Sequence, residues 1–231
     1  MPHADACLVT GYVRLDLANR SHDRYAELGQ RLTALHRPCV AFLDGLPGGD
    51  TAAVLPASLD KCWLWPHAKT APAPYGNPAK DTAAYHAVQH QKTAWLAEAS
   101  NHTTASHLVW IDYGILHVPG VTPELVGQFL ARAGTASSTR ITLPSIWPLS
   151  VDGLVDSSQP CWFVAGGVAI VPRHMAHTWH VMVEHEALTH LRQTGFLTWE
   201  VNTWARVIQQ HPSMFAVYPA DHNATLFTGL P

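Results

Sequence analysis

The sequence predicts a single α/β domain whose central sheet is mixed but mainly parallel and is flanked by helices. Segments with the pattern of buried strands alternate along the chain with segments of helical periodicity, which is the order typical of such a sheet. The chain has 231 residues, of which 47% are hydrophobic, enough for one sizeable core. Because no internal repeat or clear linker divides it, we expect one domain over residues 1–231.

The predicted strands are short runs of aliphatic, β-branched and aromatic residues that end in turn-forming residues. They span residues 6–13, 39–43, 61–65, 107–111, 141–143, 161–171 and 215–218. In the run 161–171, Gly166-Gly167 interrupts the apolar residues, which indicates either a bulge or the close approach of a ligand or another backbone. We expect loops at 46–49, 70–78 and 145–159.

Five segments place apolar residues at helical spacing. Helices are therefore expected at residues 23–36, 82–99, 122–134, 175–193 and 199–210. Asp81 or Thr82 can cap the second of these helices. Thr122-Pro123-Glu124 gives the third a cap, a first-turn proline and a first-turn acid. A turn at Thr194-Gly195 follows the fourth.

Composition narrows the class of protein. Charged residues make up 13%, the formal net charge is −3, and no run of Lys or Arg is present, which argues against a dedicated nucleic-acid binder. Partial protonation of the 16 histidines would soften that argument. The four cysteines form no CxxC pair, so we expect reduced, buried thiols. With no signal peptide and no apolar run long enough for a membrane span, a soluble cytoplasmic protein is expected.

Polar residues follow three of the predicted strands, at Thr10-Gly11, Asp44-Gly45 and Asp112-Tyr113-Gly114. The carboxyl ends of parallel strands meet at one edge of a sheet, where open α/β sheets bind their ligands. There Asp44 can accept hydrogen bonds from a base or ribose, and Asp112 can hold a cation that bridges a diphosphate. The alternative is that each acid only caps the turn that follows it.

Glu200 opens a predicted helix between Trp199 and Trp204. A first-turn acid is favoured by the helix dipole alone. The two tryptophans also suggest platforms for a sugar or a base, and a partly shielded Glu200 would have a raised pKa suited to a general base. His222 is either an ordinary surface residue or a metal ligand. The other histidines show no HExxH or HxH pattern, although His86 and His90 lie four residues apart and can share a metal.

Taken in order, these motifs resemble a known family. The chain resembles the bacterial HtrL/YibB-like family, which is similar to glycosyltransferases of the GT-A type, from about Thr10 to Asn223. The resemblance rests on the order and spacing of residues 9–12, 42–44, 80–82, 91–92, 110–115, 165–168, 199–202 and 221–223.

The resemblance implies a single GT-A-like, Rossmann-like domain and assigns roles to the motifs. Asp112 would lie at the metal motif, with Mn²⁺ or Mg²⁺ as the cation and His222 as a further ligand. Gly114 stands where that motif has its second acid. Glu200, with Asp112, would be catalytic, and Glu200 is the candidate base at the acceptor. The residues expected to bind the nucleotide sugar are Thr10, Gly11, Tyr12, Asp44, Lys92, Tyr113, Gly166, Gly167 and Asn202.

The expected activity is transfer of a sugar from a nucleotide-diphosphate sugar, with a UDP-sugar as the first expectation, to an acceptor hydroxyl. The acceptor would be a bacterial glycan, or a hydroxymethylated base in phage DNA if a basic patch is assembled from the scattered residues Arg132, Arg140, Arg173, Arg192 and Arg206. A nucleotidyltransferase and a non-catalytic nucleotide- or sugar-binding module are the alternatives. The sequence leaves open the stereochemistry of transfer and the oligomeric state.

Overall fold

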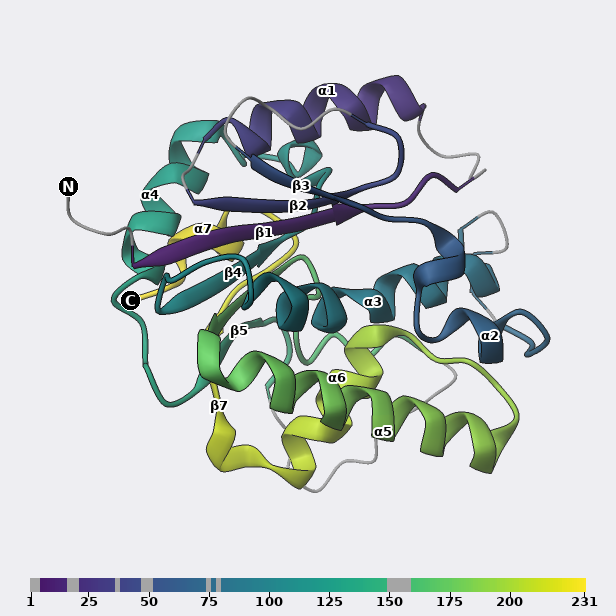
Figure 1. The fold of residues 1–231 in the computed structure, drawn as a ribbon. Coiled ribbons are helices and arrows are strands. Elements are labelled where there is room, and N and C mark those ends of the chain that lie inside the picture. Colours follow the sequence, from purple (N-terminus) through teal and green to yellow (C-terminus); the bar gives the residue numbers. More distant parts are fainter. Residues whose placement is uncertain are drawn as a thin grey trace.

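The computed structural model describes residues 5–15, 21–35, 38–46, 52–73, 76–77, 80–148 and 159–231. Within these ranges the strands join in one seven-stranded sheet (Figure 1). The strands are β1 (Ala6–Tyr12), β2 (Cys39–Leu43), β3 (Ala52–Pro56), β4 (His107–Ile111), β5 (Ile141–Ser145), β6 (Val168–Pro172) and β7 (Phe215–Pro219).

The order of strands across the sheet is β3-β2-β1-β4-β6-β5-β7. β1 pairs in parallel with β2 and β4, β2 pairs in parallel with β3, and β5 with β7. β6 runs antiparallel to both of its neighbours, β4 and β5. The predicted fold class, an α/β protein with a mainly parallel, mixed sheet between helices, is confirmed.

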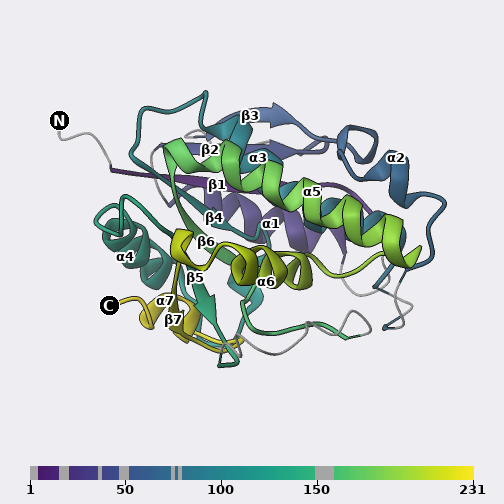
Figure 2. The ribbon, with the colours of Figure 1, turned by 90° about the horizontal axis from the view of Figure 1, so that it is seen from below.

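Helices cover both faces of this sheet. On one face lie α1 (His22–Thr33), α4 (Pro123–Ala133) and the short α7 (Thr225–Thr228). On the other lie α3 (Ala83–Ala99), α5 (Ala176–Thr194) and α6 (Glu200–Gln210), and Figure 2 is seen from their side. A short helix, α2 (Trp65–Ala68), and four single-turn 3₁₀ helices complete the described structure.

The sheet separates two hydrophobic cores, because successive side chains of a strand point to opposite faces. In β4, Leu108 and Trp110 pack with the core beneath α3, α5 and α6, whereas Val109 and Ile111 pack with the core beneath α1, α4 and α7. All five residues of β4 are buried. This double burial explains why the strand reads as a continuous apolar run.

Capping residues set the beginnings of three helices. The side chain of Ser21 accepts a hydrogen bond from the backbone N–H of Arg24, and Thr82 and Thr122 do the same for the backbone N–H three residues later. The predicted caps at Thr82 and Thr122 are therefore confirmed. Gly195, with φ of 76°, ends α5 in the left-handed conformation that glycine adopts without strain.

The predicted strand at residues 61–65 is wrong. These residues lie at the end of a 3₁₀ helix (Leu59–Lys61) and at the beginning of α2. The third strand is instead β3, which pairs with β2 at the edge of the sheet. A short apolar run does not by itself distinguish a strand from a turn packed on the core, and Trp63 and Trp65 are packed in the latter way.

The predicted strand at residues 161–171 is shorter than expected and begins at Val168. Its first part runs through Gly166-Gly167 without joining the sheet, apart from one isolated bridge between Val164 and Ser145. The carbonyl of Gly166 accepts a hydrogen bond from Lys92 Nζ. The predicted loops at 46–49, 70–78 and 145–159 lie partly outside the described residues.

The four cysteines are free thiols, as predicted, and three of them are buried. In the part of the chain that the structure describes, no helix combines the length and apolar character that crossing a bilayer requires.

His86 on α3 is a buried titratable group. Its ring packs edge-on against Trp199, with ring centroids 5.7 Å apart. Burial lowers the pKa of His86 from 6.5 to about 4, and the neighbouring His90 adds to this lowering, while Glu200 and Asp81 oppose it in part. Because the same side chain in the unfolded chain takes up a proton near pH 6.5, acid favours the unfolded state.

We expect His86→Phe to flatten the acid side of the stability profile. The wild-type protein loses stability as the pH falls from 6.5 towards about 4, since the unfolded state binds a proton that folded His86 does not. Phenylalanine keeps an aromatic ring and does not titrate, so the Tm of the variant falls less over this window. Melting curves at a series of pH values test this, with His67→Phe at an exposed position as the control. Equal slopes for wild type and His86→Phe would contradict it.

Candidate functional site

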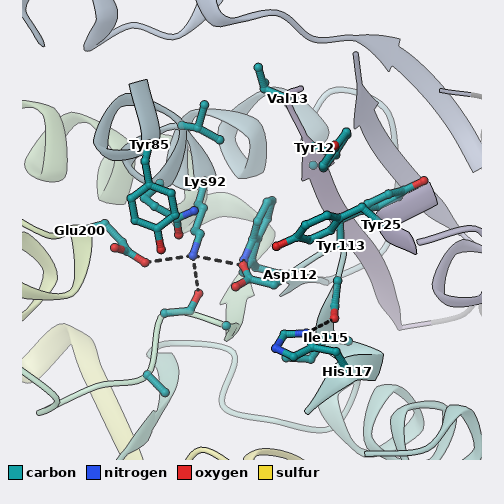
Figure 3. Close-up of a pocket in the computed structure, with 18 of the residues that line it drawn as sticks. Tyr12, Val13, Tyr25, Tyr85, Lys92, Asp112, Tyr113, Ile115, His117 and Glu200 are labelled. Atoms are coloured by element: carbon teal, nitrogen blue, oxygen red, sulfur yellow. Dashed lines mark hydrogen bonds and ion pairs between the residues drawn. The ribbon is translucent and has the colours of Figure 1, made fainter. Parts of the chain in front are cut away.

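A cavity of about 330 Å³ lies at the carboxyl ends of β1 and β4. The strand order reverses between these two strands, because β1 leads through α1 to β2 on one side while β4 lies on the other side. Ligands of open α/β sheets bind in the crevice at such a point. The cavity is lined from α1, α3, both strand ends, the Gly166-Gly167 segment and the start of α6 (Figure 3).

Most of the residues that the sequence predicts as a site come together here. The predicted residues that line the cavity are Gly11, Tyr12, Lys92, Asp112, Tyr113, Gly166, Gly167, Glu200 and His222. They come from six separate parts of the chain, so the expectation that the strand ends and the start of the last long helix meet at one edge holds for them.

Thr10, Asp44 and Asn202 do not line the cavity. Thr10 is fully buried within β1, further from the carboxyl end of the strand than Gly11 and Tyr12. The carboxylate of Asp44 accepts a hydrogen bond from the backbone N–H of Arg14 at 3.1 Å, which ties two loops together.

Asn202 is a structural residue of α6 that holds the segment before the glycine pair. Its Oδ1 accepts the backbone N–H of Cys161 at 2.6 Å, and its Nδ2 donates to the carbonyl of Gln159 at 2.8 Å and to Thr198 Oγ1 at 3.0 Å. These contacts engage both ends of the buried amide. Asn202 therefore supports the wall of the cavity without facing a ligand.

The centre of the cavity wall is the buried ammonium of Lys92, which α3 carries. Its Nζ lies 3.0 Å from Glu200 Oε1, 3.1 Å from Asp112 Oδ1 and 3.0 Å from the carbonyl oxygen of Gly166 (Figure 3). The side chain of Lys92 is 3% exposed and that of Glu200 8% exposed. An ammonium has three hydrogens to donate, and each has an acceptor here.

Burial and charge act on this cluster in opposite directions. Burial alone would lower the pKa of Lys92, but the carboxylates of Asp112 and Glu200 outweigh it and raise that pKa. Burial alone would raise the pKa of Glu200, but Lys92 outweighs it and holds that pKa below its ordinary value. The raised pKa expected for Glu200 from the sequence is therefore wrong, because the sequence does not show the ammonium beside it.

The two tryptophans around Glu200 are not ligand platforms. Trp199 is 5% exposed and Trp204 is fully buried. Trp204 packs against Trp179 of α5, with ring centroids 4.9 Å apart. The burial of both rings thus indicates packing in the interior rather than a binding surface.

Asp112 joins the cluster to the cavity. Its Oδ1 accepts a hydrogen bond from Trp110 Nε1 at 2.8 Å as well as the contact with Lys92. Its side chain is still 38% exposed. Gly166 leaves room for this arrangement, because a Cβ there would lie 2.4 Å from Glu200 Oε1, whereas a Cβ on Gly167 would make only an ordinary contact, 3.7 Å from Asp112 Oδ2.

Three tyrosines form an aromatic wall, defined here as Tyr12, Tyr25 and Tyr113. The ring of Tyr12 lies 5.4 Å from the rings of both other tyrosines, centroid to centroid. The hydroxyl of Tyr12 also hydrogen-bonds Nδ1 of His22 on α1. The wall gives the cavity an aromatic end that is distinct from its charged end.

Glycines make room for the aromatic wall. A Cβ on Gly29 of α1 would lie 1.8 Å from the ring of Tyr113, and one on Gly114 would lie 2.7 Å from the ring of Tyr25. Gly114 is the position where the resemblance expects a second acid. The ring of Tyr25 occupies the space that such a side chain would need.

Several cavity residues were missed by sequence reasoning. Tyr25 and Tyr85 belong to helical apolar faces, and Trp110 to a buried strand, so their composition predicts core packing. His22 and Trp162 carry no motif. The one available signal was the spacing of α3, which places Tyr85, Gln89 and Lys92 on one face.

The residues around Asp112 do not fit a divalent metal held by Asp112 and His222. Oδ1 of Asp112 is engaged by two donors, one of them a cation, and Gly114 has no room for a second acid. The ring of His222 packs edge-on against Trp162, with centroids 4.4 Å apart. In the described part of the chain, no three His, Cys, Asp or Glu side chains gather in a way that can hold a metal ion.

Comparison with known proteins gives a structural likeness only. No family model and no curated protein sequence matches the chain. Among solved structures it is similar to the crystal structure of a glycosyltransferase involved in the glycosylation of the major capsid of PBCV-1. The TM-score is 0.49 and the identity 11%, over 93% of this chain and 81% of that one. The HtrL/YibB-like family stays a prediction.

We expect Lys92→Met to destabilise the fold. The substitution leaves the buried carboxylate of Glu200 without its cation, and removal of one partner of a buried ion pair costs about 3–5 kcal/mol. Urea denaturation measures this loss. Lys92→Met combined with Glu200→Gln removes the uncompensated charge and should recover part of the stability. A double variant no more stable than Lys92→Met alone would show that the unpaired charge is not the cause.

Two helical glycines offer a matched pair of substitutions. We expect Gly29→Ala to destabilise the protein by about 1–3 kcal/mol, since its Cβ would overlap the ring of Tyr113. Gly127 in α4 has nothing within 4 Å of its Cβ position, so Gly127→Ala should stabilise by about 0.5–1 kcal/mol. Thermal unfolding of both variants tests the contrast. The same sign of change in both would argue against the packing role of Gly29.

Proposed function

We propose that this protein is a glycosyltransferase that moves a sugar from a nucleotide-diphosphate sugar to an acceptor hydroxyl. The observation that carries the proposal is the cavity at the point where the strand order reverses, with an aromatic end and a charged end. A nucleotide sugar has the same division, with a planar base at one end and a hydroxyl-rich ring at the other. The GT-A-like architecture expected from the sequence is compatible with this sheet order.

The aromatic end suits the base. Tyrosine faces stack on planar rings, and such stacking is tolerant of the identity of the base. Tyr12 and Tyr25 line the cavity, and His22 beside Tyr12 adds a polar group that can reach an edge of the base. Under this proposal the nucleotide lies against the ends of β1 and α1.

The charged end suits the donor sugar and the acceptor. Asp112 and Glu200 bring carboxylate oxygens to the wall of the cavity, where they can accept hydrogen bonds from the hydroxyls of a sugar ring. Glu200 remains the candidate base in this proposal. Because its pKa is held low by Lys92, it would accept the proton late, once the acceptor oxygen has begun to bond to the sugar carbon.

A glycan is the acceptor that we propose in preference to DNA. Of the five arginines considered for a basic patch, Arg140, Arg173 and Arg192 are exposed, whereas the other two have internal partners. Arg132 donates to the carbonyl of Phe227 at 2.5 Å, and Arg206 contacts Nδ1 of His190 at 2.7 Å. A DNA-binding surface needs such groups free to meet phosphates.

A panel of nucleotide sugars, incubated with the protein and assayed for release of the nucleoside diphosphate, tests the proposal. We expect one donor class to be consumed, and Asp112→Asn to slow this by about 100-fold or more. Asp60→Asn, at an exposed position outside the cavity, is the control. Consumption of a nucleoside triphosphate with release of pyrophosphate would replace the proposal with a nucleotidyltransferase. Binding without turnover would replace it with a binding module.

A further inference from the structure

We propose that Lys80 and the cavity-facing stripe of α3, rather than a divalent metal ion, receive the diphosphate of the ligand. The inference deepens the proposed function and rests on it for the identity of the ligand as a nucleoside diphosphate. It assigns a binding role to Lys80, Tyr85 and Gln89, which sequence reasoning did not include in the site. It also gives Lys92 and Asp112 a different task from metal binding.

The carboxylate of Asp112 is already engaged by groups of the protein. Its Oδ1 accepts from Trp110 Nε1 at 2.8 Å and lies 3.1 Å from Lys92 Nζ. Lys92 is not free to leave, because it is buried and also lies 3.0 Å from both Glu200 Oε1 and the Gly166 carbonyl. A divalent cation at Asp112 would therefore share the carboxylate with a fixed positive charge.

The surroundings of Asp112 offer little to complete the coordination of a divalent cation. The ring of Tyr25 lies 2.7 Å from the Cβ position of Gly114, so the chain supplies no second carboxylate there. His222, the other expected ligand, packs against Trp162 and lines the cavity together with Lys80. Asp112 lies beside Lys92, and His222 lines the same cavity as Lys80. The positive charge of each lysine disfavours a metal cation at these residues.

The charged side chains of the cavity nearly balance one another. Lys92 compensates one of the two carboxylates, which leaves one excess negative charge among Lys92, Asp112 and Glu200. Lys80 also lines the cavity and brings that group to neutrality. Its ammonium lies 5.0 Å from the centre of the Tyr85 ring, and within the described ranges no carboxylate forms an ion pair with it.

Helix α3 adds hydrogen-bond donors to the same cavity as Lys80. Tyr85, Gln89 and Lys92 recur at helical spacing on α3 and all line the cavity. Burial, with the negative charges of Glu200 and Asp112, raises the pKa of Tyr85, so its hydroxyl stays protonated and can donate. The amide of Gln89, the phenol of Tyr85 and the ammonium of Lys80 can each donate to phosphate oxygens. Lys92 has its three hydrogens engaged, and its charge compensates one of the two carboxylates, which reduces their repulsion of the phosphates.

Calorimetric titrations of the full chain with UDP, GDP and inorganic pyrophosphate, each with EDTA and with Mn²⁺, test the inference. We expect pyrophosphate and one of the two nucleotides to bind in the presence of EDTA, and Mn²⁺ not to tighten this binding. Lys80→Met should weaken this binding at least about tenfold, and Tyr85→Phe should weaken it less. Lys69→Met, at an exposed position outside the cavity, should leave it unchanged.

A second measurement uses the metal alone. The electron paramagnetic resonance signal of free Mn²⁺ should persist when the protein is added without pyrophosphate, which would itself chelate the ion. Binding of every probe only with Mn²⁺, or binding that Lys80→Met does not weaken, would overturn the inference while the proposed function stands. Metal-free pyrophosphate binding through Lys80 with no turnover of any nucleotide sugar would support the inference and remove the proposed function.

Discussion

The buried ammonium of Lys92 is the interaction on which the architecture of the site depends. A charge in the interior is tolerated only when it is fully compensated. Here α3 supplies the cation, and the end of β4, the segment before β6 and the start of α6 supply its three acceptors. None of these parts can shift without leaving a buried charge or a hydrogen unpaired, so one side chain sets the relative positions of four separate segments.

Packing of aromatic rings against glycines is the complementary constraint at the other end of the cavity. The rings of Tyr113 and Tyr25 occupy the space that side chains at Gly29 and Gly114 would fill. The same packing that builds the aromatic wall removes the second acid from the end of β4. The end of β4 therefore carries one acid, Asp112, which pairs with the internal cation Lys92, and the two halves of the site are physically linked.

Short-range sequence patterns predict several elements of the fold and part of the candidate site. Periodicity identified the strand before Asp112, and caps at Thr82 and Thr122 set the beginnings of α3 and α4. Because parallel strands end at one edge, Gly11 and Asp112 were expected together, and both line the cavity. The same reasoning predicts Thr10 and Asp44 as site residues, but neither lines the cavity. Thr10 is fully buried within β1, and a hydrogen bond from the backbone N–H of Arg14 engages Asp44.

The sequence by itself determined the α/β class, most of the elements and the placing of an acid at the end of β4, since these depend on composition and short-range spacing. Only the tertiary structure decided what that acid and Glu200 do. Lys92 and Glu200 are 108 residues apart, and their contact depends on the sheet order and on how α3 and α6 pack. No local pattern encodes that pairing, and it is the reason the pKa of Glu200 falls where its surroundings in the sequence suggested a rise.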